Sequence, residues 1–178
     1  ANRGFSPVAP GQSEDVSPEL SWNYESGARL DLNRTHAEVV AFYNDYTNIT
    51  GQCTFSGGCS GDDLGSQFNG GKAEVYGIES VVGSEIGLTE RLSIPVSATY
   101  AWTETSFTTS FNSNFPQYGQ VKAGDRLPYV ARHQASLQTG LNHERWSLNT
   151  SLSFRSGMLD QAGTDDEVDI PALLLLDA

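Results

Sequence analysis

The sequence predicts an all-β fold, an antiparallel up-and-down transmembrane β-barrel, and three observations lead to that expectation. Apolar and polar residues alternate with a period of two over long segments, which is the pattern of strands with one apolar and one polar face. Several of these segments are longer than strands of soluble proteins. The connections between them are alternately short and long, as in outer-membrane barrels.

Three segments, 21–32, 91–105 and 145–156, show the alternation most cleanly. In the first of them one face carries Trp22, Tyr24, Ala28, Leu30 and Leu32, and the other carries Asn23, Glu25, Arg29 and Asp31. A helical period of 3.6 residues does not explain this spacing. We therefore predict strands in all three segments.

Weaker alternation predicts four further strands, at 37–50, 72–88, 130–142 and 170–178. A strand of about 12 residues tilted by about 45° rises close to 28 Å, which matches the hydrocarbon thickness of a bilayer. Pro95 lies within one of the clean segments, where it would need a bulge to compensate for its missing N–H. Seven strands are too few for a usual bacterial barrel, so we expect part of a larger one.

The connections alternate strictly in length along the chain. The short ones are 33–36, 89–91 and 143–145, and the long ones are 51–71, 109–128 and 160–169. In a barrel of this kind the tight turns lie on the periplasmic side and the long loops lie outside the cell. Aromatic residues near the strand ends, among them Trp22, Tyr43, Trp102 and Trp146, would form girdles at the two membrane interfaces.

Charge and cysteine content restrict the class of protein. The chain has 22 acidic and 10 basic residues, a net charge of −12, which disfavours nucleic acid as a partner because phosphate binding needs a basic surface. Its two cysteines, Cys53 and Cys59, bracket a short Gly-rich run and predict a disulfide, hence an oxidising compartment. The chain starts without Met or a signal segment, so we expect a mature or internal fragment.

A family resemblance rests on several of these segments in order. They are GFSP, PELSWNYESGARL, AEVVAFYNDYTNITGQC, NGGKAEVYGIES and RLPYVARHQASL, and together they cover nearly the whole chain. The chain resembles the late barrel strands of TonB-dependent outer-membrane receptors, most of all their ferric-citrate-receptor-like branch. The resemblance covers residues 1–178 as a partial, C-terminal barrel domain of about seven strands, without the plug domain and the final strands.

The resemblance implies a barrel of about 22 strands, a lumen plugged by an N-terminal domain, and location in the outer membrane of a Gram-negative bacterium. It also implies import of an iron chelate, a siderophore or citrate, driven through the TonB complex, which would act on the plug and its TonB box. Outer-membrane lipid would surround the barrel. The resemblance implies neither an enzyme nor a cofactor.

The residues themselves offer no catalytic or metal site. His36, His133 and His143 are far apart in sequence, and we interpret them as surface histidines in turns and at a strand start. Two acidic clusters, Asp62 with Asp63 and 165–169, could bind Ca²⁺, but they lack EF-hand spacing and fit solvated loops better. No nucleophile elbow is present among the many serines.

Ligand contacts are expected in the long loops. Neutral hydrogen-bonding side chains and cationic ones there could hold an anionic chelate: Gln67, Asn69, Gln117, Tyr118, Lys122 and Arg126. Two other hypotheses fit the alternation. A secreted all-β adhesion or carbohydrate-binding module would pack its apolar faces together in a sandwich, and a porin-like channel would conduct ions without TonB.

Overall fold

The computed structural model describes residues 18–52, 61, 64, 67–113, 118–163 and 170–177. Its strands, in chain order, are β1 (Leu20–Leu32), β2 (Thr35–Thr47), β3 (Thr50–Gln52), β4 (Gln67–Asn69), β5 (Lys72–Thr89), β6 (Leu92–Phe107), β7 (Phe111–Asn112), β8 (Gln120–Val121), β9 (His133–His143), β10 (Trp146–Arg155) and β11 (Leu173–Asp177). The described residues contain no helix long and apolar enough to cross a membrane.

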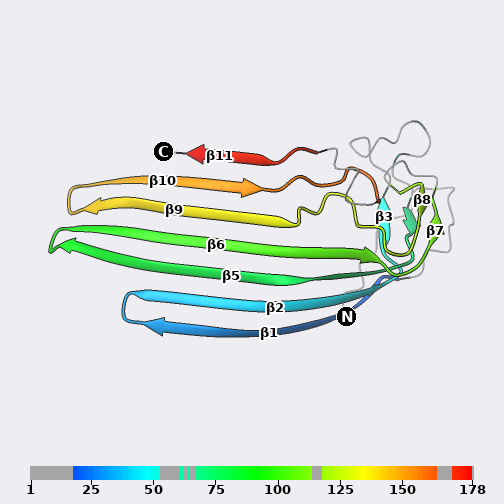
Figure 1. Cartoon of the computed structure of the whole chain (residues 1–178), viewed down its shortest axis with the longest axis horizontal. Coiled ribbons are helices and arrows are strands. Elements are labelled where there is room, and N and C mark those ends of the chain that lie inside the picture. The colour runs from blue at the N-terminus through cyan, green and yellow to red at the C-terminus, as the bar shows by residue number, and fades with distance from the viewer. Residues whose placement is uncertain are drawn as a thin grey trace.

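Seven of these strands form one antiparallel sheet in the order β1-β2-β5-β6-β9-β10-β11, so that each long strand pairs with the next one along the chain. Figure 1 shows them side by side as a curved ribbon of nearly parallel axes. The sheet is open, with β1 and β11 at its edges. The all-β, antiparallel up-and-down arrangement expected from the sequence is confirmed.

The two ends of the sheet differ in their connections. Two-residue turns at 33–34, 90–91 and 144–145 join the strands at one end, and the segments 48–71, 108–132 and 156–172 connect them at the other (Figure 1). Asn33 occupies a positive φ of 50° in the first tight turn, a backbone conformation that asparagine tolerates better than most residues. The alternation of short and long connections is therefore confirmed.

The long connections contain two small hairpins that the alternation did not predict. β3 pairs with β4, and β7 pairs with β8, each as a separate two-stranded sheet near the long-loop end. Strand limits also differ by a few residues from those expected, since β9 begins at His133 rather than at 130 and β11 spans only Leu173–Asp177. Short polar strands of two or three residues carry too little periodicity to be recognised in a sequence.

Pro95 occupies a central strand without a bulge at its own position. The register of β6 against β9 is the same on both sides of it, from Ser93 opposite Asn142 to Val96 opposite Thr139, but Ile94 and Pro95 have no ladder partners on β9. The one register shift between β5 and β6 lies at Gly87 and Thr89. The strand thus accommodates Pro95 by losing ladder hydrogen bonds.

The buried core is small and lies near the loop end. Among the described residues, the buried aliphatic and aromatic side chains are Ala73, Phe107, Val121, Ala131 and Leu159. No second sheet covers the seven-stranded one in the described part of the chain, and most of its large apolar residues are exposed. The described residues therefore do not form the sandwich expected of a secreted adhesion or carbohydrate-binding module.

Candidate functional site: an apolar outer face and an outer-loop cluster

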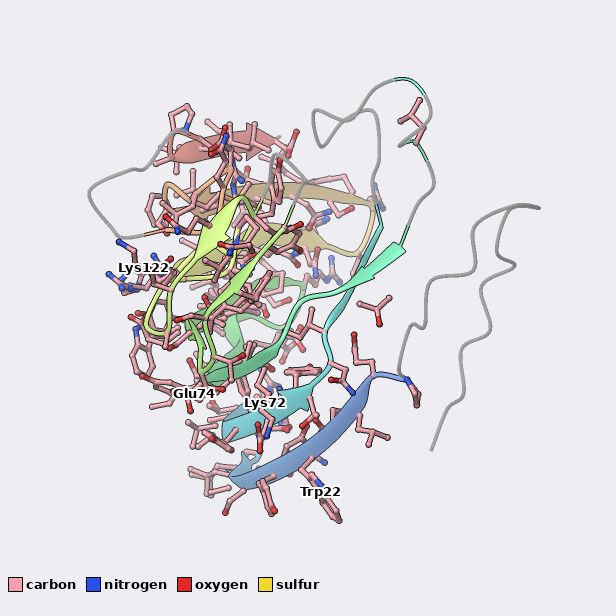
Figure 2. The ribbon with its side chains drawn as sticks, turned by 90° about the vertical axis from the view of Figure 1, so that its right-hand side faces the viewer. Trp22, Lys72, Glu74 and Lys122 are labelled. Atoms are coloured by element: carbon pink, nitrogen blue, oxygen red, sulfur yellow. The ribbon has the colours of Figure 1, made fainter. Side chains whose placement is uncertain are left out.

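One face of the sheet is apolar across all seven strands. The ladder registers place the alternate residues of neighbouring strands on a common face. Its large members are Trp22, Tyr24, Leu30, Leu32, Val39, Tyr43, Tyr76, Ile78, Val82, Ile86, Ile94, Val96, Tyr100, Trp102, Leu137, Leu141, Trp146, Leu148, Leu152, Phe154, Leu174 and Leu176. Trp22 is 69% exposed, and Figure 2 shows its side chain projecting away from the ribbon.

A row of aromatic rings crosses this apolar face near the long-loop end. The ring centroids of Tyr24 and Tyr43 lie 6.4 Å apart, those of Tyr43 and Tyr76 also 6.4 Å, and those of Tyr76 and Trp102 6.1 Å. The hydroxyl of Tyr43 donates a hydrogen bond of 3.0 Å to Glu74, toward the loop end. Rings with an apolar body and a polar tip are typical of a boundary between hydrocarbon and water.

The tight-turn end of the same face also carries a ring pair. Trp146 stacks on His143 with centroids 5.4 Å apart, and His143 lies opposite Leu92 on β6. The distance from Leu92 to Trp102 along β6 is about 33 Å, which at a tilt of about 40° gives about 25 Å across the sheet. Between the two rows the apolar face of the described strands carries no Asp, Glu, Lys or Arg. An uncharged band of this height fits the hydrocarbon layer of an outer membrane.

The opposite face is mainly polar, although it also carries Val81, Leu173 and Leu175, and its polar side chains are hydrogen-bonded to one another. Arg29 on β1 pairs with Glu38 on β2 at 2.7 Å, and Asp31 lies 2.7 Å from the ring of His36. Farther along the sheet, short hydrogen bonds of 2.7 Å join Ser93 to Glu85 and Thr99 to Ser136. Side chains of this kind are suited to a water-filled interior, as the lumen of a barrel is.

The three long connections meet in one apolar cluster at the loop end. Ala73 and Phe107, both from the polar face of the sheet, are fully buried together with Val121. Partly buried residues of all three connections pack against them: Ile49, Phe111, Tyr118, Leu127 and Ala162. We call these eight residues the outer-loop cluster. Because it forms on the polar side of the sheet, the loops fold inward over that face.

Tyr118 is the titratable member of this cluster. Its ring lies edge-on to Phe107 with centroids 6.2 Å apart and tilted against Phe111 at 6.3 Å. Burial raises the pKa of the Tyr118 phenol above its ordinary value, and the nearby phenol of Tyr129 raises it further. Tyr118 therefore stays neutral and packs as part of the cluster.

An ion-pair cluster fixes the segment that leads into β9. Arg126 lies 3.8 Å from Glu104 of β6, and Arg132 contacts the same carboxylate through Nε and, at 3.1 Å, through Nη2. The backbone of this segment is hydrogen-bonded to β6 as well: the N–H of Phe107 donates to the carbonyl of Asp125, and the N–H of Thr103 donates to the carbonyl of Arg132. Arg126 also exchanges backbone hydrogen bonds with Gly163. The outer segments 122–132 and 156–163 are thus attached to the sheet and to each other.

The residues predicted to contact a ligand are only partly brought together. Tyr118 is half-buried in the outer-loop cluster, Lys122 is exposed, and Arg126 is 8% exposed against Glu104. Gln67 and Asn69 lie at the two ends of β4. Gln117, the predicted Cys53–Cys59 disulfide and the acidic clusters at 62–63 and 165–169 lie outside the described residues.

The histidines were partly misplaced in the sequence interpretation. His36 is the second residue of β2 and His143 is the last residue of β9, so neither lies in a turn. His133 begins β9 as expected and lies 2.8 Å from the hydroxyl of Tyr100. Within the described ranges no group of His, Cys, Asp and Glu side chains is arranged to hold a metal ion.

Sequence interpretation missed Glu104 as an anchor of the outer segment. Its signal was present, because Glu104 follows Trp102 at an apolar-face position of β6, where the alternation favours an uncharged side chain. A carboxylate at such a position indicates either the end of the apolar band or a charged partner, and here both hold. Tyr129, in the same outer segment, adopts a positive φ of 60°, and no pattern in the sequence predicts this conformation.

Comparison with known proteins agrees with this geometry. The model of the family described as "TonB dependent receptor-like, beta-barrel" matches residues 2–178. Proteins of this family are outer-membrane receptors and transporters of Gram-negative bacteria rather than enzymes. No curated protein matches the sequence. An uncharged aromatic-bordered face, a polar inner face and a family match over nearly the whole chain lead to one conclusion: the chain belongs to the TonB-dependent receptor β-barrel family.

Proposed function

We propose that the chain forms part of the barrel wall and outer loops of a receptor that imports a ferric siderophore or ferric citrate. In this proposal the TonB complex supplies the energy by acting on a plug domain in the lumen. The cargo binds at the outer loops and passes through the lumen when the plug rearranges. No covalent bond is made or broken by residues of this chain.

The observation that carries the proposal is the uncharged band of the apolar face between its two aromatic rows. A soluble protein rarely exposes a contiguous apolar surface of this extent. The polar face, with ion pairs such as Arg29–Glu38, supports an aqueous interior on the other side of the wall. Membership of the TonB-dependent receptor β-barrel family supports a receptor rather than another kind of barrel protein.

The outer loops are where cargo recognition is proposed. Lys122 is exposed at the loop end and labelled in Figure 2, so it can present an ammonium group to an anionic chelate. Gln67, Asn69, Gln117 and Tyr118 remain candidate hydrogen-bonding partners. Arg126 faces Glu104, so its part in binding would be to hold the loop in place.

Uptake by the full-length receptor tests the proposal. A strain without its own ferric-citrate and siderophore receptors would express the protein, and uptake of radioactive iron as citrate or siderophore chelates would be measured with and without TonB. We expect uptake of one chelate class that stops when TonB is removed. Uptake that continues without TonB would point to a porin-like channel, and no uptake of any iron chelate would refute the proposed cargo.

Two lysines give a matched pair for the binding step. Lys122→Gln should weaken binding of an anionic chelate up to about tenfold, because it removes one charge-assisted contact. Lys72→Gln is the control, since Lys72 lies at the same end of the molecule but on the outward face of β5, opposite Thr47 (Figure 2). Equal affinities for the two variants would exclude Lys122 from the site.

A further inference from the structure

Two tight turns lie side by side at the end of the sheet opposite the long loops. The turn 90–91 joins β5 to β6, the turn 144–145 joins β9 to β10, and the β6–β9 ladder brings them together at the pair of Leu92 and His143. Figure 1 shows both turns next to each other at this end. We call residues 90–91 and 144–145 the turn surface.

The turn surface lies directly beyond the uncharged band. His143 and Trp146 form the last row of the apolar face before the turns, and their stacked rings have centroids 5.4 Å apart. Where the lipid-facing apolar surface of a membrane protein ends, phospholipid headgroups begin. The chain belongs to a family of outer-membrane barrels, whose tight turns lie on the periplasmic side. The headgroups that meet the turn surface are therefore those of the periplasmic leaflet.

The turn surface carries two charges of each sign. Each turn has a glutamate followed by an arginine, Glu90 with Arg91 and Glu144 with Arg145, and all four residues are exposed. Nε of Arg91 lies 3.5 Å from the Glu144 carboxylate, but these side chains are 72% and 57% exposed, so water screens the pair. Arg145 takes part in no ion pair of the described residues. A surface with separate carboxylates and guanidinium groups and no net charge is complementary to a zwitterion.

His143 adds a hydrogen-bond donor beside Arg145. The backbone N–H of Arg145 donates to Nδ1 of His143 at 3.4 Å, so in the neutral ring the hydrogen is on Nε2. This N–H and the guanidinium of Arg145 are suited to phosphate oxygens. The Glu144 carboxylate has lone pairs to spare beyond its contact with Arg91, and it can accept hydrogen bonds from an ammonium group.

We propose that the turn surface binds the headgroup of phosphatidylethanolamine in the periplasmic leaflet. Arg145, with Nε2 of His143, binds the phosphate, and Glu144 accepts hydrogen bonds from the primary ammonium. The rings of His143 and Trp146 contact the glycerol and the upper part of the acyl chains. Phosphatidylcholine carries the same phosphate and the same net charge, but its methylated nitrogen has no N–H to donate. The turn surface therefore prefers phosphatidylethanolamine to phosphatidylcholine.

Photolabelling of the full-length receptor in phosphatidylcholine vesicles tests the preference. The vesicles would contain a trace of phosphatidylethanolamine or phosphatidylcholine with a diazirine close to the glycerol, and mass spectrometry would measure labelling of the peptide that contains Trp146. We expect phosphatidylethanolamine to label this peptide about threefold more strongly, a small factor because the charges are exposed to water. Equal labelling by the two lipids would overturn the inference.

Two substitutions separate the two halves of the headgroup. Glu144→Gln should abolish the preference for phosphatidylethanolamine, because the ammonium loses its charged acceptor. Arg145→Gln should lower labelling by both lipids about two- to fivefold, because both carry the phosphate. If Glu144→Gln kept the preference, or Arg145→Gln left both yields unchanged, the assignment of these residues would be wrong.

The matched controls are the same changes on the polar face at this end of the sheet. Glu85 accepts a hydrogen bond of 2.7 Å from Ser93, and Nη1 of Arg34, from the third tight turn, lies 2.7 Å from where a Cβ of Gly87 would be. Glu85→Gln and Arg34→Gln should leave both yields unchanged, and an effect as large as that of Glu144→Gln or Arg145→Gln would refute a lipid-facing site.

Free phosphoethanolamine distinguishes a lipid site from a site for a soluble ligand. It lacks the acyl chains that place the headgroup beside the rings of His143 and Trp146, so it should not lower the labelling more than sodium chloride of equal ionic strength. Stronger competition would mean that the turn surface takes the soluble compound, and the lipid assignment would be wrong. Neither cargo nor TonB takes part in these measurements, so their failure would leave the proposed function untouched.

Discussion

Glu104 of β6 lies between two arginines of the segment that leads into β9, with its carboxylate 3.8 Å from Nε of Arg126 and 3.1 Å from Nη2 of Arg132. The side chain of Arg126 is about as buried as that of a core residue, whereas exposed surface pairs contribute little. A charge placed in this setting is stabilised only while its partner is present. Glu104 is therefore positioned to determine whether the outer segment stays attached to the sheet.

Glu104→Gln should detach segment 122–132 locally without unfolding the sheet. Removing the carboxylate weakens the ion pair with Arg126 and the charge-assisted hydrogen bond from Arg132, and we expect a local loss of about 2 kcal/mol. Hydrogen exchange would report it as faster exchange at Leu127, whose N–H bonds to Thr105. Glu74→Gln changes a carboxylate on the neighbouring strand and should leave hydrogen exchange at Leu127 unchanged. If Glu104→Gln also left this exchange rate unchanged, the contacts of Glu104 with the two arginines would be no more than surface ion pairs.

The long strands could be predicted from sequence because a sheet with one lipid-facing and one water-facing side imposes strict alternation. The segment 21–32, for example, differs from β1 by one residue at its start. The same physics explains why Tyr24, Tyr43 and Trp102 could be expected at a membrane interface, whereas Tyr76 was not expected there and is placed in the row by the register of β5 with β2. What the alternation could not fix was how far each strand extends into its loop.

The loop end could not be predicted, because its contacts join residues far apart in sequence and follow no period. Phe107 belongs to the polar face by alternation, yet it is fully buried under Val121 and Phe111 because the β7–β8 hairpin folds over it. Arg126 was predicted as a ligand contact from its charge and loop position. Only the three-dimensional structure shows the carboxylate that it faces.

Two glycines of β5 should respond differently to an added methyl group. A Cβ at Gly77 would overlap the carbonyl of Trp102 and lie 2.9 Å from the ring of Phe42, whereas at Gly83 the nearest atom, the carbonyl oxygen of Val96, is 3.9 Å away. Gly77→Ala should cost about 1–3 kcal/mol through overpacking. Gly83→Ala should be neutral or slightly stabilising, because alanine restricts the unfolded chain. Urea unfolding of the refolded full-length protein in lipid vesicles would compare them, and equal stabilities would contradict the close approach at Gly77.

The outer-loop cluster should loosen at high pH through Tyr118. Its pKa is raised above the ordinary tyrosine value of about 10, so below that pH the phenol is protonated in both the packed and the open loop. Above it the open state releases a proton that the packed state retains, and the stability of the cluster falls as pH rises. Tyr118→Phe keeps the ring contacts and should remove this pH dependence. Protease digestion of the loops across about pH 8 to 11 would measure it, and the change should correspond to one titrating group. A variant that loosens identically would exclude Tyr118 as the cause.

Val81 and Val82 provide the most direct test of which face meets lipid. They are neighbours in the middle of β5, 38% and 47% exposed, but Val81 belongs to the polar face and Val82 to the uncharged band. An arginine at the lipid-facing position near the bilayer midplane costs about 2–4 kcal/mol, whereas a lumen-facing one remains hydrated. Val82→Arg should therefore lower the unfolding free energy in lipid vesicles by that amount, and Val81→Arg by less than about 1 kcal/mol. In detergent micelles the difference should shrink, because the charged end of the arginine side chain can reach water around a micelle more easily. A larger cost at position 81 than at position 82 would mean that the two faces are assigned the wrong way round.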